Sequence, residues 1–205
     1  MTVVIFCVGR RGSDMDMRAH IIEVAGTLFY AEGIRAVGVD RIIAEAGIAK
    51  ATLYRHFATK EALVVAYLRD RYERITQHLR EQVLENDQPD PAEKALLPYR
   101  ILQEMGARSE YRGCAFLLAV AENEGCAPVL AVAREYRRWI LQMFTELAGN
   151  LTDEADELSE ELTLCFEGAM AAMAIHREPF AAEVARRCAF ALIRARQPLS
   201  VASVA

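Results

Sequence analysis

Residues 38–57 read GVDRIIAEAGIAKATLYRHF, a stretch that predicts two short amphipathic helices joined by a tight turn. In the first helix, apolar side chains recur at helical spacing at Val39, Ile42 and Ala46. Gly47 follows where the chain must turn sharply, and glycine adopts the positive φ of such a turn without steric cost. We therefore predict a helix-turn-helix over this stretch.

The second helix of the motif, predicted from Ala51 to Phe57, has Leu53 and Phe57 four residues apart on its inner face. A helix fits the major groove of DNA, and its N-terminal turn reaches the base edges. The short side chains of Ala51 and Thr52 allow a close approach, and their methyl groups can meet a thymine methyl. We expect the outer face to contact bases or phosphates through Lys50, Ala51, Thr52, Tyr54, Arg55 and His56.

Helical periodicity continues along nearly the whole chain, with little alternating strand pattern. Thr59 is a candidate cap, and Asp90, Pro91 and Glu93 occupy the N-cap, N1 and N3 positions of a further helix. Glycine and proline divide the pattern into about nine helices. The fold class we predict is all-α, with an N-terminal three-helix helix-turn-helix head and a C-terminal helical bundle that dimerises through its last two helices.

We place the head at residues 14–60 and the body at residues 61–198. Residues 1–13 are expected to form a disordered or loosely packed tail, because their apolar run is too short for a signal peptide or a membrane span. Translation from Met15 or Met17 is the alternative to a start at Met1. Residues 199–205 are expected to fray.

Charge is unevenly distributed in this chain, whose net charge is −5. Residues 1–60 hold eight Lys and Arg against six Asp and Glu, a balance of +2, whereas the remainder has a balance of −7. A slightly basic head on an acidic body fits a protein that touches DNA at one end only.

The sequence lacks the patterns of several enzyme and metal-binding classes. No Gly-rich phosphate loop, G-x-S-x-G or H-E-x-x-H occurs, and the four histidines are widely separated. The five cysteines form no C-x-x-C pair, so we expect buried, reduced thiols in a cytoplasmic protein. We expect no enzymatic activity, no metal, no cofactor and no membrane association.

Residues 39–63 join, in one register, a turn glycine, the core Thr-Leu-Tyr-x-His-Phe and a following Lys. This segment resembles the TetR family of transcriptional repressors, and the likeness extends back over residues 18–33. The family usually has Thr or Ser where this chain has Gly38, and a small residue in place of Ile43. Glycine is a tolerated N-cap, so we expect local repacking without loss of function.

The resemblance implies DNA-contacting roles for matching residues. Lys50, Ala51 and Thr52 would face bases or adjacent phosphates. Val39 would offer a backbone amide to a phosphate at its helix N-terminus, beside Gly38. The resemblance also implies that phosphates are anchored by Tyr54, His56 and Lys60, while Arg55 points outward without an assigned contact.

One recognition helix reads only a few base pairs, so the body is expected to form a homodimer on a near-palindromic operator. Residues 162–175 are apolar on nearly every face, and a helix of this kind must be buried on both sides. The last helix carries a second apolar side. The predicted interface residues are Leu162, Gly168, Ala169, Ala172, Phe180, Val184, Cys188 and Leu192.

The family resemblance further implies a body pocket for a small-molecule effector that changes the spacing of two heads. Methionine and aromatic side chains suit an irregular apolar ligand. The candidate pocket residues are Tyr67, Tyr99, Leu102, Met105, Phe116, Trp139, Met143, Phe166 and Met170.

These features predict a sequence-specific transcriptional regulator that binds double-stranded DNA, a repressor released from its operator by the effector. A DNA-binding protein without an effector remains an open alternative. A ligand-binding dimer that has lost DNA recognition is disfavoured, because Thr52, Tyr54, His56 and Lys60 are all present.

Overall fold

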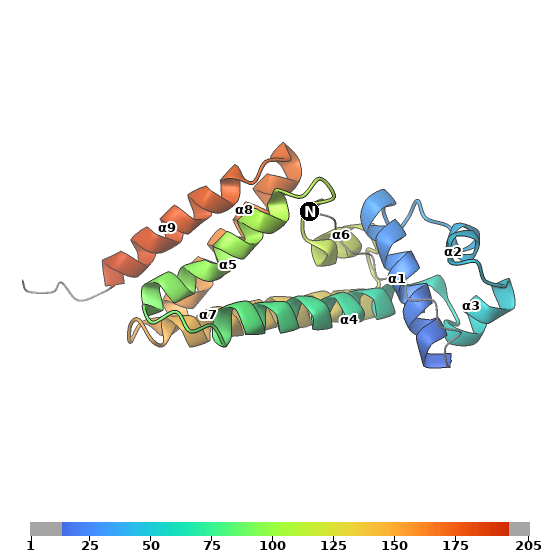
Figure 1. Ribbon diagram of the computed structural model, residues 1–205, viewed down its shortest axis with the longest axis horizontal. Coiled ribbons are helices and arrows are strands. Elements are labelled where there is room, and N and C mark those ends of the chain that lie inside the picture. The colour runs from blue at the N-terminus through green and yellow to red at the C-terminus, as the bar shows by residue number, and fades with distance from the viewer. Residues whose placement is uncertain (1–13, 197–205) are drawn as a thin grey trace, which may run out of the picture. The chain divides into compact units, whose positions relative to one another are not determined.

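The computed structural model describes residues 14–196, which divide into two compact units at the boundary between Tyr67 and Leu68. All regular elements of this range are helical: nine α-helices and one π-helical turn (Figure 1). The predicted all-α fold with an N-terminal helix-turn-helix is thereby confirmed. The tails expected at residues 1–13 and 199–205 lie outside the described residues.

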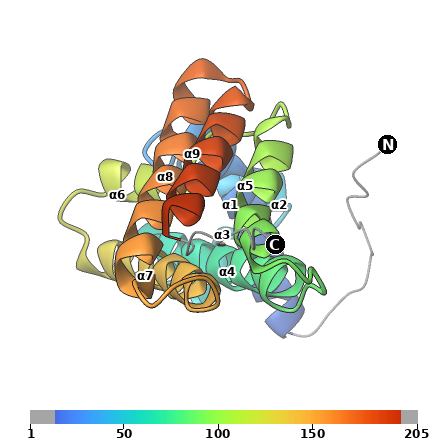
Figure 2. The same ribbon diagram turned by 90° about the vertical axis from the view of Figure 1, so that its left-hand side faces the viewer.

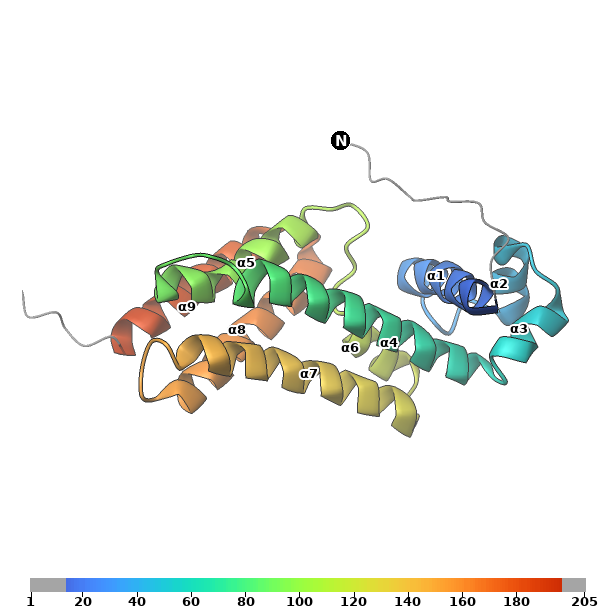
Figure 3. The same ribbon diagram turned by 60° about the horizontal axis from the view of Figure 1, so that its bottom comes forward.

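The first unit contains α1 (Asp14–Glu32), α2 (Val39–Ala46), α3 (Lys50–His56) and the beginning of α4 (Lys60–Leu79). The apolar stripe of α1 is buried, with Ile21 and Ala25 at 0% exposure, and Gly33 ends the helix with a φ of 96°. α2 packs against both α1 and α3. Figure 3 shows α4 as one long, uninterrupted helix.

The second unit continues α4 through a π-helical turn (Arg80–Leu84) and adds five further helices. They are α5 (Pro91–Gly106), α6 (Ala115–Glu122), α7 (Ala127–Ala148), α8 (Ala155–His176) and α9 (Phe180–Arg196). α8 packs on α7 and α9, and α5 packs on α9 (Figure 2).

The predicted helix caps are present in both units. The Thr59 hydroxyl accepts a hydrogen bond of 3.0 Å from the amide of Ala62, in the first turn of α4. The Asp90 carboxylate accepts one of 2.9 Å from the amide of Ala92, and Pro91 follows at the first position of α5. Each cap satisfies an amide that the helix itself leaves unpaired.

An aromatic cluster forms the core of the second unit. The Tyr99 ring lies 5.8 Å from the Phe144 ring and 5.9 Å from the Phe166 ring, so α5, α7 and α8 meet at this cluster. The Tyr99 hydroxyl donates a hydrogen bond of 2.7 Å to the backbone carbonyl of Leu162. Burial raises the pKa of Tyr99 far above its usual value, so the hydroxyl stays protonated and remains a donor.

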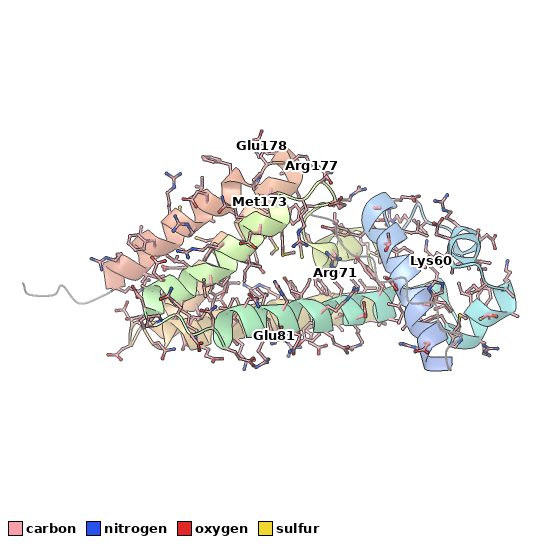
Figure 4. The ribbon with its side chains drawn as sticks, in the orientation of Figure 1. Lys60, Arg71, Glu81, Met173, Arg177 and Glu178 are labelled. Carbon is pink, nitrogen blue, oxygen red and sulfur yellow. The ribbon has the colours of Figure 1, made fainter. Side chains whose placement is uncertain are left out.

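The loop between α5 and α6 lies against the C-terminal end of α8. A Cβ on Gly113, which has a φ of 98°, would come within 2.7 Å of the Ala174 Cβ, so a larger residue would force the two segments apart. The guanidinium of Arg177, labelled in Figure 4, donates a hydrogen bond of 2.8 Å to the Tyr111 carbonyl. These contacts hold one wall of the cavity described below.

We predict that Tyr99→Phe lowers the free energy of unfolding by about 1 kcal/mol, the usual net contribution of a buried hydrogen bond. Urea denaturation at a fixed protein concentration measures the change. Tyr72→Phe, at a half-buried tyrosine of α4, serves as the matched control and is expected to change stability less. Equal effects of the two substitutions would contradict a structural role for the Tyr99 hydroxyl.

Candidate DNA-binding site and ligand cavity

The outward face of α3 presents four exposed side chains: Lys50, Ala51, Tyr54 and Arg55. Their spacing places them on one side of the helix, with Thr52 and His56 half-buried at its edges. Tyr54 is 44% exposed although it is a large aromatic residue. All six residues expected on the outer face of this helix are thus exposed or lie at its margin.

Burial of the opposite side fixes the orientation of α3. Leu53 is 0% exposed and Phe57 is 3% exposed. Phe57, predicted as the last residue of this helix, is instead its C-cap and has an extended backbone. The guanidinium carbon of Arg18, on α1, lies 5.1 Å from the centre of the Phe57 ring, a distance typical of a cation–π contact. Gly47 adopts the left-handed conformation predicted for it, with a φ of 64°.

An ion pair joins the two helices of the motif. The Lys50 ammonium lies 3.2 Å from a carboxylate oxygen of Asp40, and both side chains are exposed. Sequence reasoning assigned Lys50 to DNA and gave Asp40 no role. The ten-residue separation of the two residues across a turn offers no periodic signal, so the pair emerges only from the fold.

The remaining predicted DNA contacts lie at helix ends. Gly38 is the exposed N-cap of α2, without a side-chain cap, and Val39 follows as its half-buried first residue. Lys60 begins α4, and its ammonium donates a hydrogen bond of 2.6 Å to the Ile34 carbonyl.

A cavity of about 320 Å³ lies within the second unit. It is lined by residues of α4, α5, α6, α7 and α8 and of the loop between α5 and α6. Five of the sequence-derived pocket candidates line it: Leu102, Met105, Phe116, Phe166 and Met170.

The other four candidates lie outside this lining. Tyr99 and Met143 are fully buried in the core, and Trp139 is half-buried on α7. Tyr67 belongs to the first unit, where its ring lies 5.8 Å from that of Phe29. Their apolar side chains correctly indicated burial. Helical periodicity alone does not show whether a buried side chain packs in the core or lines a cavity.

Sequence reasoning missed the charged part of the lining. Arg71, Arg74 and His78 of α4 and Arg108 of the following loop all border the cavity. Residues three, four and seven apart share a face of a helix, so the spacing of these α4 residues indicates a basic face that could have been found from the sequence.

Comparison with known proteins gives consistent results. The family described as "Bacterial regulatory proteins, tetR family" matches residues 21–67. A solved structure of SCO4454, a TetR-family transcriptional regulator from Streptomyces coelicolor, is 33% identical with a TM-score of 0.79, covering 90% of this chain and 97% of that one. The chain belongs to the TetR family of transcriptional regulators. The resemblance expected from residues 39–63 is confirmed.

Two further relatives are named as transcriptional regulators. An uncharacterized HTH-type transcriptional regulator, Rv1255c of Mycobacterium tuberculosis (strain H37Rv), is 29% identical over 163 residues, 67% of this chain and 78% of its own length. The HTH-type transcriptional repressor KstR2 of Rhodococcus jostii is 42% identical over 52 residues, 25% of this chain and 26% of its own length.

The predicted interface residues of this TetR-family chain fall into two groups. Leu162 and Ala169 are buried inside the subunit. Gly168, Phe180 and Cys188 are exposed, and the half-buried remainder comprises Ala172, Val184 and Leu192.

The exposed apolar side of α8 is formed instead by a stripe of helical spacing. Leu164 is 68% exposed and Ile175 is 75% exposed, with Gly168 and Ala171 exposed between them. A Cβ placed on Gly168 would meet nothing within 4 Å. This side of the helix therefore has no partner among the described residues of the subunit.

The cysteines differ from the expectation of buried thiols. The four described cysteines form no disulfide; Cys188 is exposed, and the other three are half-buried. The Cys114 thiol borders the cavity, and burial raises its pKa. Cys7 lies outside the described residues. Among the described residues, no group of three or more His, Cys, Asp or Glu could hold a metal ion, and no helix is long and apolar enough to cross a membrane.

We predict that Asp40→Asn strengthens binding to any DNA duplex about threefold, because it removes a negative charge beside the exposed side of α3 that is expected to face DNA, and because it releases Lys50. Fluorescence anisotropy with specific and unrelated duplexes measures the change. Asp87→Asn, which removes an exposed carboxylate from the second unit, is the charge-matched control. A loss of affinity in Asp40→Asn would show instead that Asp40 orients Lys50 for binding.

Proposed function

We propose that the protein is a homodimeric repressor that binds a near-palindromic DNA operator and leaves it when a small molecule occupies the cavity of the second unit. The exposed side of α3 carries this proposal. A short helix that buries Leu53 and Phe57 while exposing Lys50, Tyr54 and Arg55 has the form of a recognition helix. Residues 14–60 are assigned to DNA binding, and residues 61–198 to sensing and dimerisation.

The proposed contacts follow from exposure and chemistry. Lys50, Ala51 and Thr52, in the first turn of α3, are assigned to bases and neighbouring phosphates. Tyr54, His56 and Lys60 are assigned to phosphates, which set the register of the protein on the duplex. The amide of Val39 meets a phosphate at the N-terminus of α2, where Gly38 leaves the backbone accessible.

Dimerisation supplies the second recognition helix that a specific site requires. The exposed apolar stripe of α8 and the exposed Phe180 of α9 support pairing of the second unit with a second copy. Gly168 supports close helix approach, because it leaves open space on that side. Exposed apolar surface of this extent on a helix favours association.

Release by an effector is supported by the cavity and by α4. The same helix carries Lys60 in the first unit and borders the cavity at Arg71, Arg74 and His78. A ligand that binds one conformation of this helix more tightly shifts the population of DNA-binding molecules. Repression is our proposal for the sign of regulation; the repressor KstR2 matches over 52 residues and the activator FasR of Mycolicibacterium smegmatis over 75, so a reporter experiment decides the sign. The site of action is the cytoplasm, where a bacterial operator is found.

We predict that the protein binds DNA from just upstream of its own gene and protects a near-palindrome, and that Tyr54→Ala weakens this binding at least tenfold. Footprinting and anisotropy at two salt concentrations measure the protected site, the affinity and its salt dependence. Thr27→Ala, at an exposed residue of α1, is the control and keeps the native affinity. A reporter under the same promoter is expected to rise in the Tyr54→Ala strain.

Equal binding of native and Tyr54→Ala protein to specific and unrelated DNA would contradict recognition by α3. A reporter that falls in the Tyr54→Ala strain would identify an activator in place of a repressor.

We predict that Gly168→Arg converts the dimer to a monomer without unfolding the subunit. In a helix, arginine is favoured over glycine by about 1 kcal/mol, and the added side chain meets no atom of its own subunit near its Cβ. Sedimentation velocity measures the mass, and circular dichroism measures helix content. Ala131→Arg, at an exposed position of α7, adds the same charge as a control. A Gly168→Arg protein that stays dimeric would place the interface elsewhere.

A further inference from the structure

The cavity of the second unit combines an apolar wall with a cationic one. On the apolar wall, the rings of Phe116 and Tyr136 are stacked, with centroids 4.1 Å apart and planes 13° apart. Leu102, Phe166 and Met170 extend this wall. Such a surface suits a flat or branched apolar body.

The cationic wall comes mainly from one face of α4. Arg71, Arg74 and His78 border the cavity at spacings of three and seven residues, and Arg108 of the loop after α5 joins them. No Asp or Glu occurs among the described residues that line the cavity. The lining therefore has a strong positive bias although the chain as a whole is acidic.

The nearby carboxylates are held by other partners. The Asp70 carboxylate pairs with Arg74 at the surface, outside the lining. Glu167 lies 3.3 Å from Arg137 of α7, and it does not line the cavity.

Arg71 is the innermost of the basic residues by which α4 lines the cavity. Its side chain is half-buried, whereas those of Arg74 and His78 are exposed. Burial raises the pKa values of Cys114 and Tyr136. The positive charge of Arg71 opposes that rise at both groups and the negative charge of Glu167 adds to it, so both charged side chains lie near this end of the cavity. In Figure 4, Arg71 is labelled at the edge of α4 that lies toward α5 and α6.

We infer that this cavity binds a small organic anion: one carboxylate-like head group on an aromatic or branched apolar body. The guanidinium of Arg71 receives the head group, and the stacked rings of Phe116 and Tyr136 receive the body. A planar guanidinium matches a carboxylate with two parallel hydrogen bonds, and a charge-assisted bond in a partly buried site is strong. The inference rests on the proposal that this cavity is the effector site, and it names the chemical class of the effector.

The test compares three ligands that share one apolar body and differ in charge: 4-phenylbutyrate, 4-phenylbutan-1-ol and 4-phenylbutylamine. Isothermal titration calorimetry on the full chain without DNA measures each affinity. We expect the carboxylate to bind at least tenfold more tightly than the alcohol or the amine. Equal affinities, preference for the amine, or no binding of the carboxylate up to millimolar concentration would overturn the inference.

Substitution of the cation tests the assigned partner. Arg71→Met keeps the length and apolar stem of the side chain, and it is expected to weaken carboxylate binding about tenfold while changing alcohol binding less than twofold. Arg71→Lys keeps the charge and is expected to retain part of the affinity, so it separates loss of charge from loss of folding. Arg138→Met, at an exposed arginine of α7 outside the lining, is the matched control. Equal losses for carboxylate and alcohol in Arg71→Met would overturn the role of Arg71.

DNA binding by the same variants separates this inference from the proposed function. Native operator binding by Arg71→Met, together with lost carboxylate selectivity, supports both. Native operator binding with no charge selectivity in the unsubstituted protein overturns the anion inference and leaves the DNA-binding role standing. Charge-selective ligand binding without any operator binding supports the inference and removes the repressor role.

Discussion

Burial of Leu53 and Phe57 beneath α3 is the constraint on which the DNA-binding surface depends. Leu53 lies on one side of this seven-residue helix and Phe57 follows as its C-cap, so the burial of both side chains turns the opposite side of α3 outward. Lys50, Tyr54 and Arg55 are exposed as a consequence. Gly47 and the stacking of Arg18 on Phe57 fix the ends of this arrangement, so a small apolar contact determines which residues can reach DNA.

In the second unit, single helices both pack in the core and present residues to the surface or to the cavity. α8 buries Leu162, Phe166 and Ala169 in the subunit and leaves the stripe from Leu164 to Ile175 exposed. α4 holds apolar residues in the core and directs Arg71 toward the cavity. A helix of more than three turns has enough faces for both tasks, because residues three and four apart share a side and those two apart do not.

The elements that sequence predicted well are those with local signals. Helix ends marked by Gly47, Thr59 and Asp90 depend on neighbours within a few residues, and the structure has them where the sequence placed them. The pairing of Lys50 with Asp40 and the cationic wall of the cavity depend on segments brought together by the fold. Tyr99 is likewise an aromatic residue of the kind that often contacts a ligand. Only its hydrogen bond to the Leu162 carbonyl in the structure assigns it to the core.

Selection of bound sequences from a pool of random DNA duplexes tests the central claim, which is that a pair of α3 helices reads DNA. The account predicts enrichment of one near-palindrome, with half-sites separated by about one or more helical turns, as two symmetric recognition helices require. Enrichment of a single asymmetric half-site would contradict recognition of DNA by a pair of α3 helices. No enrichment over a pool recovered with Tyr54→Ala would contradict DNA recognition by α3 altogether.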